Sequence, residues 1–272
     1  MDFKHLQLNT STLRSPEKIM EFIENRKWGA NGIDVGCFQE ICYPIGEQNP
    51  LQKLLEGKGC YYAEGIHYHY LPKKITIAVG IFSRWPIIDY TKLYYNTETY
   101  HPKEITGEEF MNHNLIGETR VAQFPGSRAL ANSVKPRCIL SVLVDSPSGP
   151  LRVVTTHFTV TDLCTETHQM YEMSRILNSY IGTAKPLPTI FSADLNIRPQ
   201  SYSVGKISEV MTCHTKDLEN TLSDDHIAIT GGDFPGGLAV DHVFSSNVEY
   251  LKTDLVQVDF SVHKALVSEF AL

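Results

Sequence analysis

Short apolar runs recur along the whole sequence, and the segments between them are polar or carry helical patterns. The runs are residues 3–8, 33–39, 76–83, 139–144, 151–156, 188–192, 238–245 and 265–270. Apolar runs of this length, without strict alternation, are typical of strands that are buried on both faces. Such strands need a covering layer on each side of their sheet, so the pattern predicts an α/β fold.

Helical patterns separate some of these runs. Ser15, Pro16 and Glu17 form a typical helix start, with serine as the N-cap and proline at the first helical position. Residues 162–181 are predicted to form one long helix, because apolar side chains recur there at helical spacing.

The composition is that of an ordinary globular protein, with 272 residues of which 42% are hydrophobic and 20% charged. No repeat or linker divides the chain, so we expect a single domain over residues 1–272. The six cysteines form no CxxC pair, which fits neither a zinc site nor a dense disulfide framework. No signal-peptide pattern and no apolar stretch long enough to span a membrane is evident, so we expect a cytoplasmic protein.

The charge balance bears on the possible partners. The chain has 24 basic and 31 acidic residues, a net charge of −7, so no basic footprint indicates nucleic acid. This weakens a nucleic-acid function without excluding it, because an active site needs only local positive charge, part of which a metal ion can supply.

Polar side chains stand where the apolar runs end. They are Asn9, Glu40, His157, Asp194 and Asn196, with His263 just before the last run. Loops at the ends of sheet strands are where a rigid scaffold presents catalytic groups. Asp194 and Asn196 alone could be ordinary turn residues, but several oxygen ligands, amides and histidines placed in this way indicate a metal-dependent phosphate site.

A second histidine pattern has a plainer interpretation. His67 and His69 alternate in a strand-like segment and would share one face, as zinc ligands sometimes do. No third ligand is evident nearby in the sequence, so we interpret both as residues on the surface of a strand.

Several short segments together resemble the endonuclease/exonuclease/phosphatase superfamily, whose members include pancreatic deoxyribonuclease, tyrosyl-DNA phosphodiesterases and inositol-polyphosphate phosphatases. In the order of that superfamily, the matching segments are Leu8-Asn9-Thr10, Phe38-Gln39-Glu40, residues 81–87, residues 154–158, Ser192-Ala193-Asp194-Leu195-Asn196, residues 240–244 and Ser261-Val262-His263. Each segment is weak evidence alone, but together they cover nearly the whole chain. Uncharacterised bacterial members with a His-Phe-Thr segment, as at His157, are the most similar.

The resemblance implies a deoxyribonuclease I-like fold, a two-sheet, four-layer α/β sandwich, and it implies a Mg²⁺ ion (or Mn²⁺) as cofactor. By the resemblance, Glu40 binds the metal with Asn9 close by, and Asp194 orients and deprotonates the attacking water. Both metals favour oxygen ligands.

The resemblance also implies how phosphate is held. Asn196, His157 and His263 would donate hydrogen bonds to phosphate oxygens as charge builds in the transition state. Asp241 would fix the tautomer of His263 and raise its pKa. Arg137, just before an apolar run, is a further candidate for contacting phosphate.

One position departs from the superfamily pattern. Where the superfamily has Ser-Asp-His, this chain has Ser261-Val262-His263, and the missing aspartate belongs to the metal site. Valine offers no oxygen, so we expect weaker Mg²⁺ binding or greater reliance on Asn9 and water. Asp259 is a remote candidate to replace the lost carboxylate.

Three functions are compatible with these features. The first is a phosphodiesterase on nucleic acid, whose groove would be lined by the irregular stretch 96–132 with its aromatic and basic residues. The second is hydrolysis of a small phosphoester, such as a sugar, inositol or lipid-headgroup phosphate, which the acidic balance favours. The third is a catalytically weakened member that only binds, because of Val262. We expect a monomer.

Overall fold

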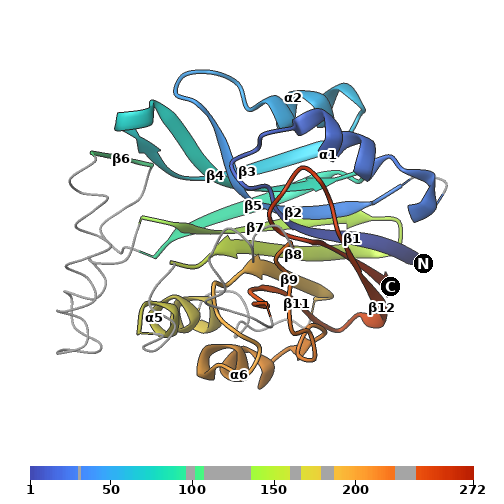
Figure 1. Cartoon of the computed structure of the whole chain (residues 1–272). Helices are drawn as coiled ribbons and strands as arrows, with labels where there is room; N and C mark the ends of the chain where they lie inside the picture. Colours follow the sequence, from blue (N-terminus) through green and yellow to red (C-terminus); the bar gives the residue numbers. More distant parts are fainter. Residues whose placement is uncertain (30–31, 96–101, 107–135, 160–166, 179–186, 224–236) are drawn as a thin grey trace.

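Two β-sheets packed face to face form the centre of the molecule (Figure 1). The computed structural model describes residues 1–29, 32–95, 102–106, 136–159, 167–178, 187–223 and 237–272. The first sheet has the strand order β12-β13-β1-β2-β4-β3-β6 and the second β10-β11-β9-β8-β7-β5.

The eight apolar runs correspond to strands β1, β2, β4, β7, β8, β9, β11 and β13, whereas the other described strands have no run of their own. The strands of the first sheet are β1 (Asp2–Asn9), β2 (Val35–Pro44), β3 (Tyr61–Tyr70), β4 (Ile75–Ser83), β6 (Lys103–Ile105), β12 (Glu249–Val256) and β13 (Ala265–Ala271). Those of the second are β5 (Ile87–Tyr94), β7 (Cys138–Ser146), β8 (Gly149–His157), β9 (Thr189–Asp194), β10 (Thr212–Cys213) and β11 (Asp241–Ser246). The run predicted at 238–245 becomes a strand only from Asp241 onward.

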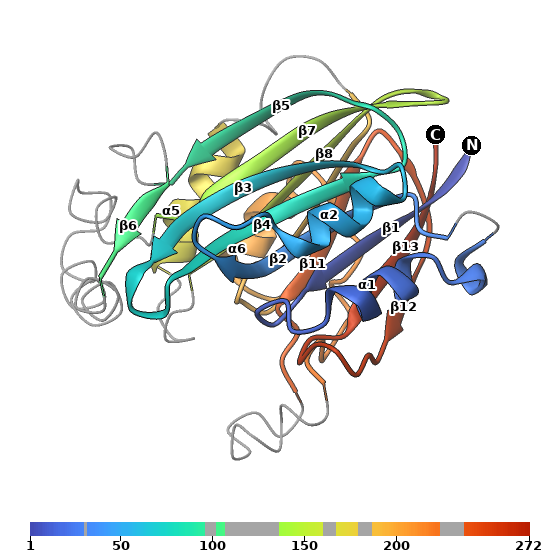
Figure 2. The same ribbon diagram turned by 90° about the horizontal axis from the view of Figure 1, so that it is seen from above.

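Helices cover the outer face of each sheet (Figures 1 and 2). On the first sheet they are α1 (Pro16–Ile23) and α2 (Pro50–Gly57), and on the second α5 (Thr167–Ile176) and α6 (Tyr202–Ser208); short 3-10 turns occupy Arg26–Trp28 and Leu71–Lys73. The predicted four-layer α/β sandwich is therefore confirmed. The long helix predicted over residues 162–181 is described as the helix Thr167–Ile176, and residues 160–166 and 179–186 lie outside the described part.

Three apolar layers hold these elements together. One lies between the two sheets, where Val79 and Ile81 of the first meet Val142 and Val153 of the second. The other two lie between each sheet and its helices. Strands of both sheets therefore bury side chains on both faces, which explains why the apolar runs do not alternate with polar residues.

Parallel pairing brings strand ends together. β1 runs parallel to β2, and β8 parallel to β9, with Asn9 opposite Gln39 and His157 opposite Asp194. Carboxyl ends of parallel neighbours meet at the same edge, so these residues gather at one end of the sandwich.

His67 and His69 differ from the expectation of two surface residues on one face. The register of β3 against β4 shifts between Ile66 and Tyr68, and this irregularity turns His67 inward, where it is fully buried. His69 is half-buried and its Nδ1 lies 3.0 Å from Thr76 Oγ1.

The described cysteines form no disulfide bonds. Cys37 and Cys138 are buried free thiols, as expected, and the other described cysteines are also free. Within the described residues, no helix has the length and hydropathy that crossing a membrane requires.

Gly36 of β2 marks a close contact within the core, because a Cβ atom there would lie 2.3 Å from Cε1 of the buried Phe82 ring. We predict that Gly36→Ala lowers the free energy of unfolding by about 1–3 kcal/mol through overpacking, measured by urea denaturation. Gly205→Ala in α6 is the control, since nothing lies within 4 Å of the added methyl group, and it should be neutral or stabilising. Equal effects of the two changes would contradict the packing argument.

Candidate active site

Asp194 lies at the centre of a buried polar cluster at the carboxyl end of β9. Its Oδ2 is 2.8 Å from Asn9 Nδ2, 3.4 Å from His157 Nε2 and 3.9 Å from His263 Nε2. Its Oδ1 accepts the backbone N–H of Asn196 at 2.9 Å. Residues from four separate parts of the chain thus meet at one carboxylate.

The buried environment of Asp194 raises the pKa of its carboxyl group. Burial, and next the neighbouring charge of Asp241, raise the pKa of Asp194 to about 7, although His263 and the hydrogen bonds from Asn9 and the Asn196 backbone oppose the shift. A carboxyl group with a pKa near neutrality can take up a proton from water and give it back.

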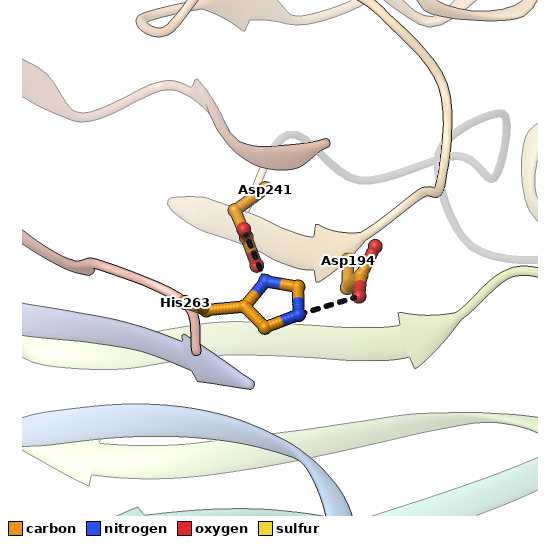
Figure 3. A group of neighbouring side chains, drawn as sticks. All are labelled: Asp194, Asp241 and His263. Atoms are coloured by element: carbon orange, nitrogen blue, oxygen red, sulfur yellow. Dashed lines mark hydrogen bonds and ion pairs between the residues drawn. The ribbon is translucent and has the colours of Figure 1, made fainter. Parts of the chain in front are cut away.

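His263 lies between two carboxylates (Figure 3). Its Nδ1 is 2.8 Å from Asp241 Oδ2, while its Nε2 faces Asp194. Burial alone lowers the pKa of His263, but the charge and hydrogen bond of Asp241, then the charges of Asp194 and Glu40, raise this pKa to about 9. His263 is therefore a cation at neutral pH.

Asp241 is held from both sides. Thr221 Oγ1 donates to its Oδ2 at 2.7 Å, and Gln7 Nε2 donates to its Oδ1 at 3.3 Å. Gln7 and Gln39 exchange side-chain hydrogen bonds, and Gln39 Nε2 also donates to Thr155 Oγ1 at 2.9 Å. This chain of amides crosses between the sheets and fixes Asp241 relative to both.

Sequence reasoning missed Gln7, Thr155 and Thr221 as parts of the site. The available signal was a fully buried amide within the apolar run of β1, since Gln7 stands between Leu6 and Leu8. Buried amides need hydrogen-bond partners, so such a residue indicates a polar network between the sheets.

Glu40 does not follow β2, as the sequence suggested, but lies inside it at an irregularity. The register against β4 shifts between Phe38 and Ile41, and Glu40 has a φ of 53°, in the left-handed region. Thr10 Oγ1 holds the bulge by donating to the Glu40 carbonyl at 2.9 Å. A non-glycine residue held in this region is often found at functional sites.

The site offers oxygen ligands suited to a hard cation. The half-buried carboxylate of Glu40 accepts no hydrogen bond within the described part of the chain. The Oδ1 of Asn9 accepts the Ser11 N–H at 2.9 Å and keeps a second lone pair. Carboxylate and amide oxygens are the ligand types that Mg²⁺ and Mn²⁺ favour, so Glu40 and Asn9 stay the predicted ligands. Asp194, Asp241 and His263 also lie close enough together to hold an ion, but the cationic form of His263 disfavours one there.

Asn196 and Arg137 both hold the backbone that follows His157. Asn196 has a φ of 52° and its Nδ2 donates to the Phe158 carbonyl at 2.8 Å. The buried Arg137 donates through Nη1 to the carbonyls of His157, at 3.0 Å, and Phe158. Both side chains therefore position the His157 segment, and their expected contact with phosphate stays a prediction.

Val262 lies in a short segment that is tied to β1. Ser261 Oγ donates to the Asn9 carbonyl at 2.6 Å, and the Val262 N–H donates to Ser11 Oγ at 3.0 Å. Asp259 does not replace the missing carboxylate, because its side chain is 75% exposed and forms an ion pair with Lys18 at 2.6 Å.

Comparisons with known proteins agree with this architecture. No family model and no curated protein matches the sequence. Among solved structures, an endonuclease/exonuclease/phosphatase from Beutenbergia cavernae superimposes with a TM-score of 0.71 at 16% sequence identity. The alignment covers 100% of this chain and 72% of the Beutenbergia chain. One from Bacteroides vulgatus has a TM-score of 0.70 at 13% identity, covering 100% and 99%.

A third solved structure is D. rerio TDP2 in complex with a single-strand DNA product, with a TM-score of 0.63 at 12% identity and coverage of 100% and 99%. The chain thus has the fold of the endonuclease/exonuclease/phosphatase proteins, and the resemblance seen in its sequence is confirmed at the level of the fold.

The ion pair of His263 with Asp241 makes a prediction about pH. In Asp241→Asn, the pKa of His263 should fall well below its wild-type value of about 9, measured by NMR titration of the imidazole, because the largest opposing charge and its hydrogen bond are removed and only the charges of Asp194 and Glu40 still oppose burial. The interactions that raise the pKa of His263 stabilise the folded wild-type protein. Their full contribution is present below pH 6.5 and is lost as pH rises through about 9.

The stability cost of Asp241→Asn should therefore be on the order of 3 kcal/mol near pH 6 and shrink above pH 9. Asp259→Asn is the matched control, since its carboxylate is exposed. A cost that is independent of pH would contradict the charged state of His263.

Proposed function

We propose that this protein is a metal-dependent phosphoesterase that uses Mg²⁺ or Mn²⁺ and hydrolyses phosphodiester bonds in nucleic acid by in-line attack of water. The observation that carries the proposal is the pairing of Asp194, whose pKa is raised to about 7, with His263, whose pKa is raised to about 9. Two neighbouring groups with separated pKa values can act as a base and as a cationic phosphate ligand at the same pH.

Each residue has a chemical role in this proposal. Asp194, positioned by Asn9, accepts a proton from the attacking water and orients its oxygen toward phosphorus. His263 and His157 donate hydrogen bonds to phosphate oxygens and stabilise the charge that builds on them. A metal held by Glu40 and Asn9 would supply positive charge that neutralises the phosphate.

Asn196 and Arg137 have a shared role in the proposal. Each holds a backbone carbonyl next to His157, and each has a further N–H group that an oxygen of the substrate could accept. The Nε of Arg137 is buried without a hydrogen-bond partner. Within the described residues, no carboxylate forms an ion pair with the Arg137 guanidinium. A bound anion could accept a hydrogen bond from this Nε and balance the charge of the buried guanidinium.

Nucleic acid is the preferred substrate for a specific reason. A structure with this fold, D. rerio TDP2, is described with a single-strand DNA product. The alternative, a small phosphoester, is favoured by the net charge of −7, since a polyanion gains little from an acidic surface. Of the stretch 96–132 that we expect to line a groove, residues 96–101 and 107–132 lie outside the described part. We further propose a single cytoplasmic domain that is a monomer.

The first test is hydrolysis by the purified protein of labelled single- and double-stranded DNA and RNA, with a panel of small phosphomonoesters alongside. We predict Mg²⁺- or Mn²⁺-dependent cleavage that chelation abolishes and that Asp194→Asn lowers by about 10²–10⁴-fold, because the proton acceptor is lost. Asp259→Asn should retain wild-type activity. Absence of any activity that depends on both metal and Asp194 would refute the proposal.

The metal site has its own test, with binding as the readout. Glu40→Gln should weaken Mn²⁺ binding by about tenfold or more in calorimetry, because an amide lacks the negative charge of the carboxylate. Glu47→Gln, at an exposed position outside the site, should bind as the parent does. Unchanged affinity in Glu40→Gln would remove Glu40 from the metal site.

Val262→Asp distinguishes an enzyme from a protein that only binds. We predict that the parent is active and that the restored carboxylate lowers the Mg²⁺ concentration needed for half-maximal activity. If instead the parent is inactive and Val262→Asp gains strong Mg²⁺-dependent activity, this chain is a weakened member of its fold.

A further inference from the structure

One edge of the first sheet is only partly paired. β3 pairs with β4 from Tyr61 to Tyr70, but on its other side β6 pairs with it only at Tyr68, His69 and Tyr70. Within the described residues, no strand pairs with that edge over residues 61–67. The short β6 shows that this edge accepts a parallel strand.

The main chain of this edge carries open hydrogen-bonding groups. The Ile66 carbonyl points away from β4, because it accepts the hydroxyl of Tyr94 at 2.8 Å. In an antiparallel pair, main-chain groups alternate between the partner and the free side, so Glu64 and Tyr62 point outward as Ile66 does. Their N–H and C=O groups have no partner in the described part of the chain.

A groove of about 430 Å³ runs along these groups. Its floor is formed by residues 60–64, one wall by Glu56 of α2, and the other by Ile87, Tyr90 and Lys92 of β5. In Figure 2, β3 lies between β5, at the upper outline of the molecule, and α2. The candidate active site lies elsewhere, where β1, β8 and β9 end.

The two walls differ in charge. On the side of α2, Glu56 is exposed, and Glu64 accepts hydrogen bonds from Asn49, at 2.7 Å, and Tyr43, at 2.6 Å, so its carboxylate is fixed in place. On the side of β5, the Lys92 ammonium lies 5.6 Å from the centre of the Tyr90 ring. An aromatic face and a cation there disfavour a second cation and favour an apolar group.

We propose that this groove binds an extended peptide that adds to β3 as a further strand. Its main chain would bond to the open groups of Tyr62 and Glu64, which gives affinity without sequence dependence. Its side chains alternate between the two walls. A basic residue fits the side of Glu56 and Glu64, and an apolar residue fits the side of Tyr90, so the partner is a segment in which Lys or Arg alternates with apolar residues.

A second copy of this chain fits the edge less well. Two β3 edges related by a twofold axis would present the same patch to each other, so Glu56 and Glu64 of one copy would approach those of the next. Like charges placed across a contact are unfavourable, whereas a basic peptide neutralises them.

The test uses a fluorescently labelled peptide of four Lys-Val repeats. The expected result is saturable binding by fluorescence anisotropy, with slowed hydrogen exchange at the amides of Tyr62 and Glu64 measured by NMR. Glu56→Lys should weaken binding by about tenfold because it reverses the charge of one wall. Glu47→Lys makes the same charge change at an exposed position outside the groove and should bind normally.

Two further peptides make the test specific. A Lys-Val peptide with alternate N-methylated amides should not bind, because it cannot complete the main-chain hydrogen bonds, and a Glu-Val peptide should bind at least tenfold more weakly. Equal binding of either peptide, or no protection at Tyr62 and Glu64, would overturn the proposal. Protection of the same amides by self-association, without peptide, would assign the edge to a second copy instead. None of these readouts depends on phosphoesterase activity.

Discussion

The arrangement at the end of the sandwich depends on the position of one imidazolium between two buried carboxylates. Without the charge of His263, Asp194 and Asp241 would repel each other in a medium that screens them poorly. The charge of His263 opposes this repulsion, and the pKa of Asp194 rises to about 7. Hydrogen bonds from Thr221 and from the Gln7–Gln39 pair between the sheets hold Asp241 in position beside His263. The fold thus holds the side chains of Asp194, Asp241 and His263 at fixed separations.

Much of the fold was predictable because buried strands have a strong signature. The apolar runs around β2, β4, β7, β8 and β9 were identified since both faces of these strands are covered. The exposed edge strands β5 and β12 were not, because their sequences are largely polar and solvated. Helix α2 also lacked a sequence prediction, as its apolar stripe has only two fully buried residues, Leu51 and Leu55.

The site was predicted less completely than the fold. Side chains of Asn9, His157, Asp194, Asp241 and His263 do meet, as the strand-end positions and the resemblance indicated. Their roles in catalysis remain predictions. The bulge at Glu40 and the shift that buries His67 were outside the reach of sequence reasoning, because a register irregularity is decided by packing of the neighbouring strand and not by local composition.

The contributions of Asn9 and His263 come from segments 254 residues apart, joined because the strand after His263 pairs with the strand that carries Asn9. A contact of such long sequence separation carries a large loop-closure entropy cost, which slows folding. On the ribosome, Asp194 and Asp241 are made before the histidine that will sit between them. A nascent chain therefore holds two acids without their cation, so the proposed chemistry cannot start until synthesis has passed residue 263 and the last strand has docked.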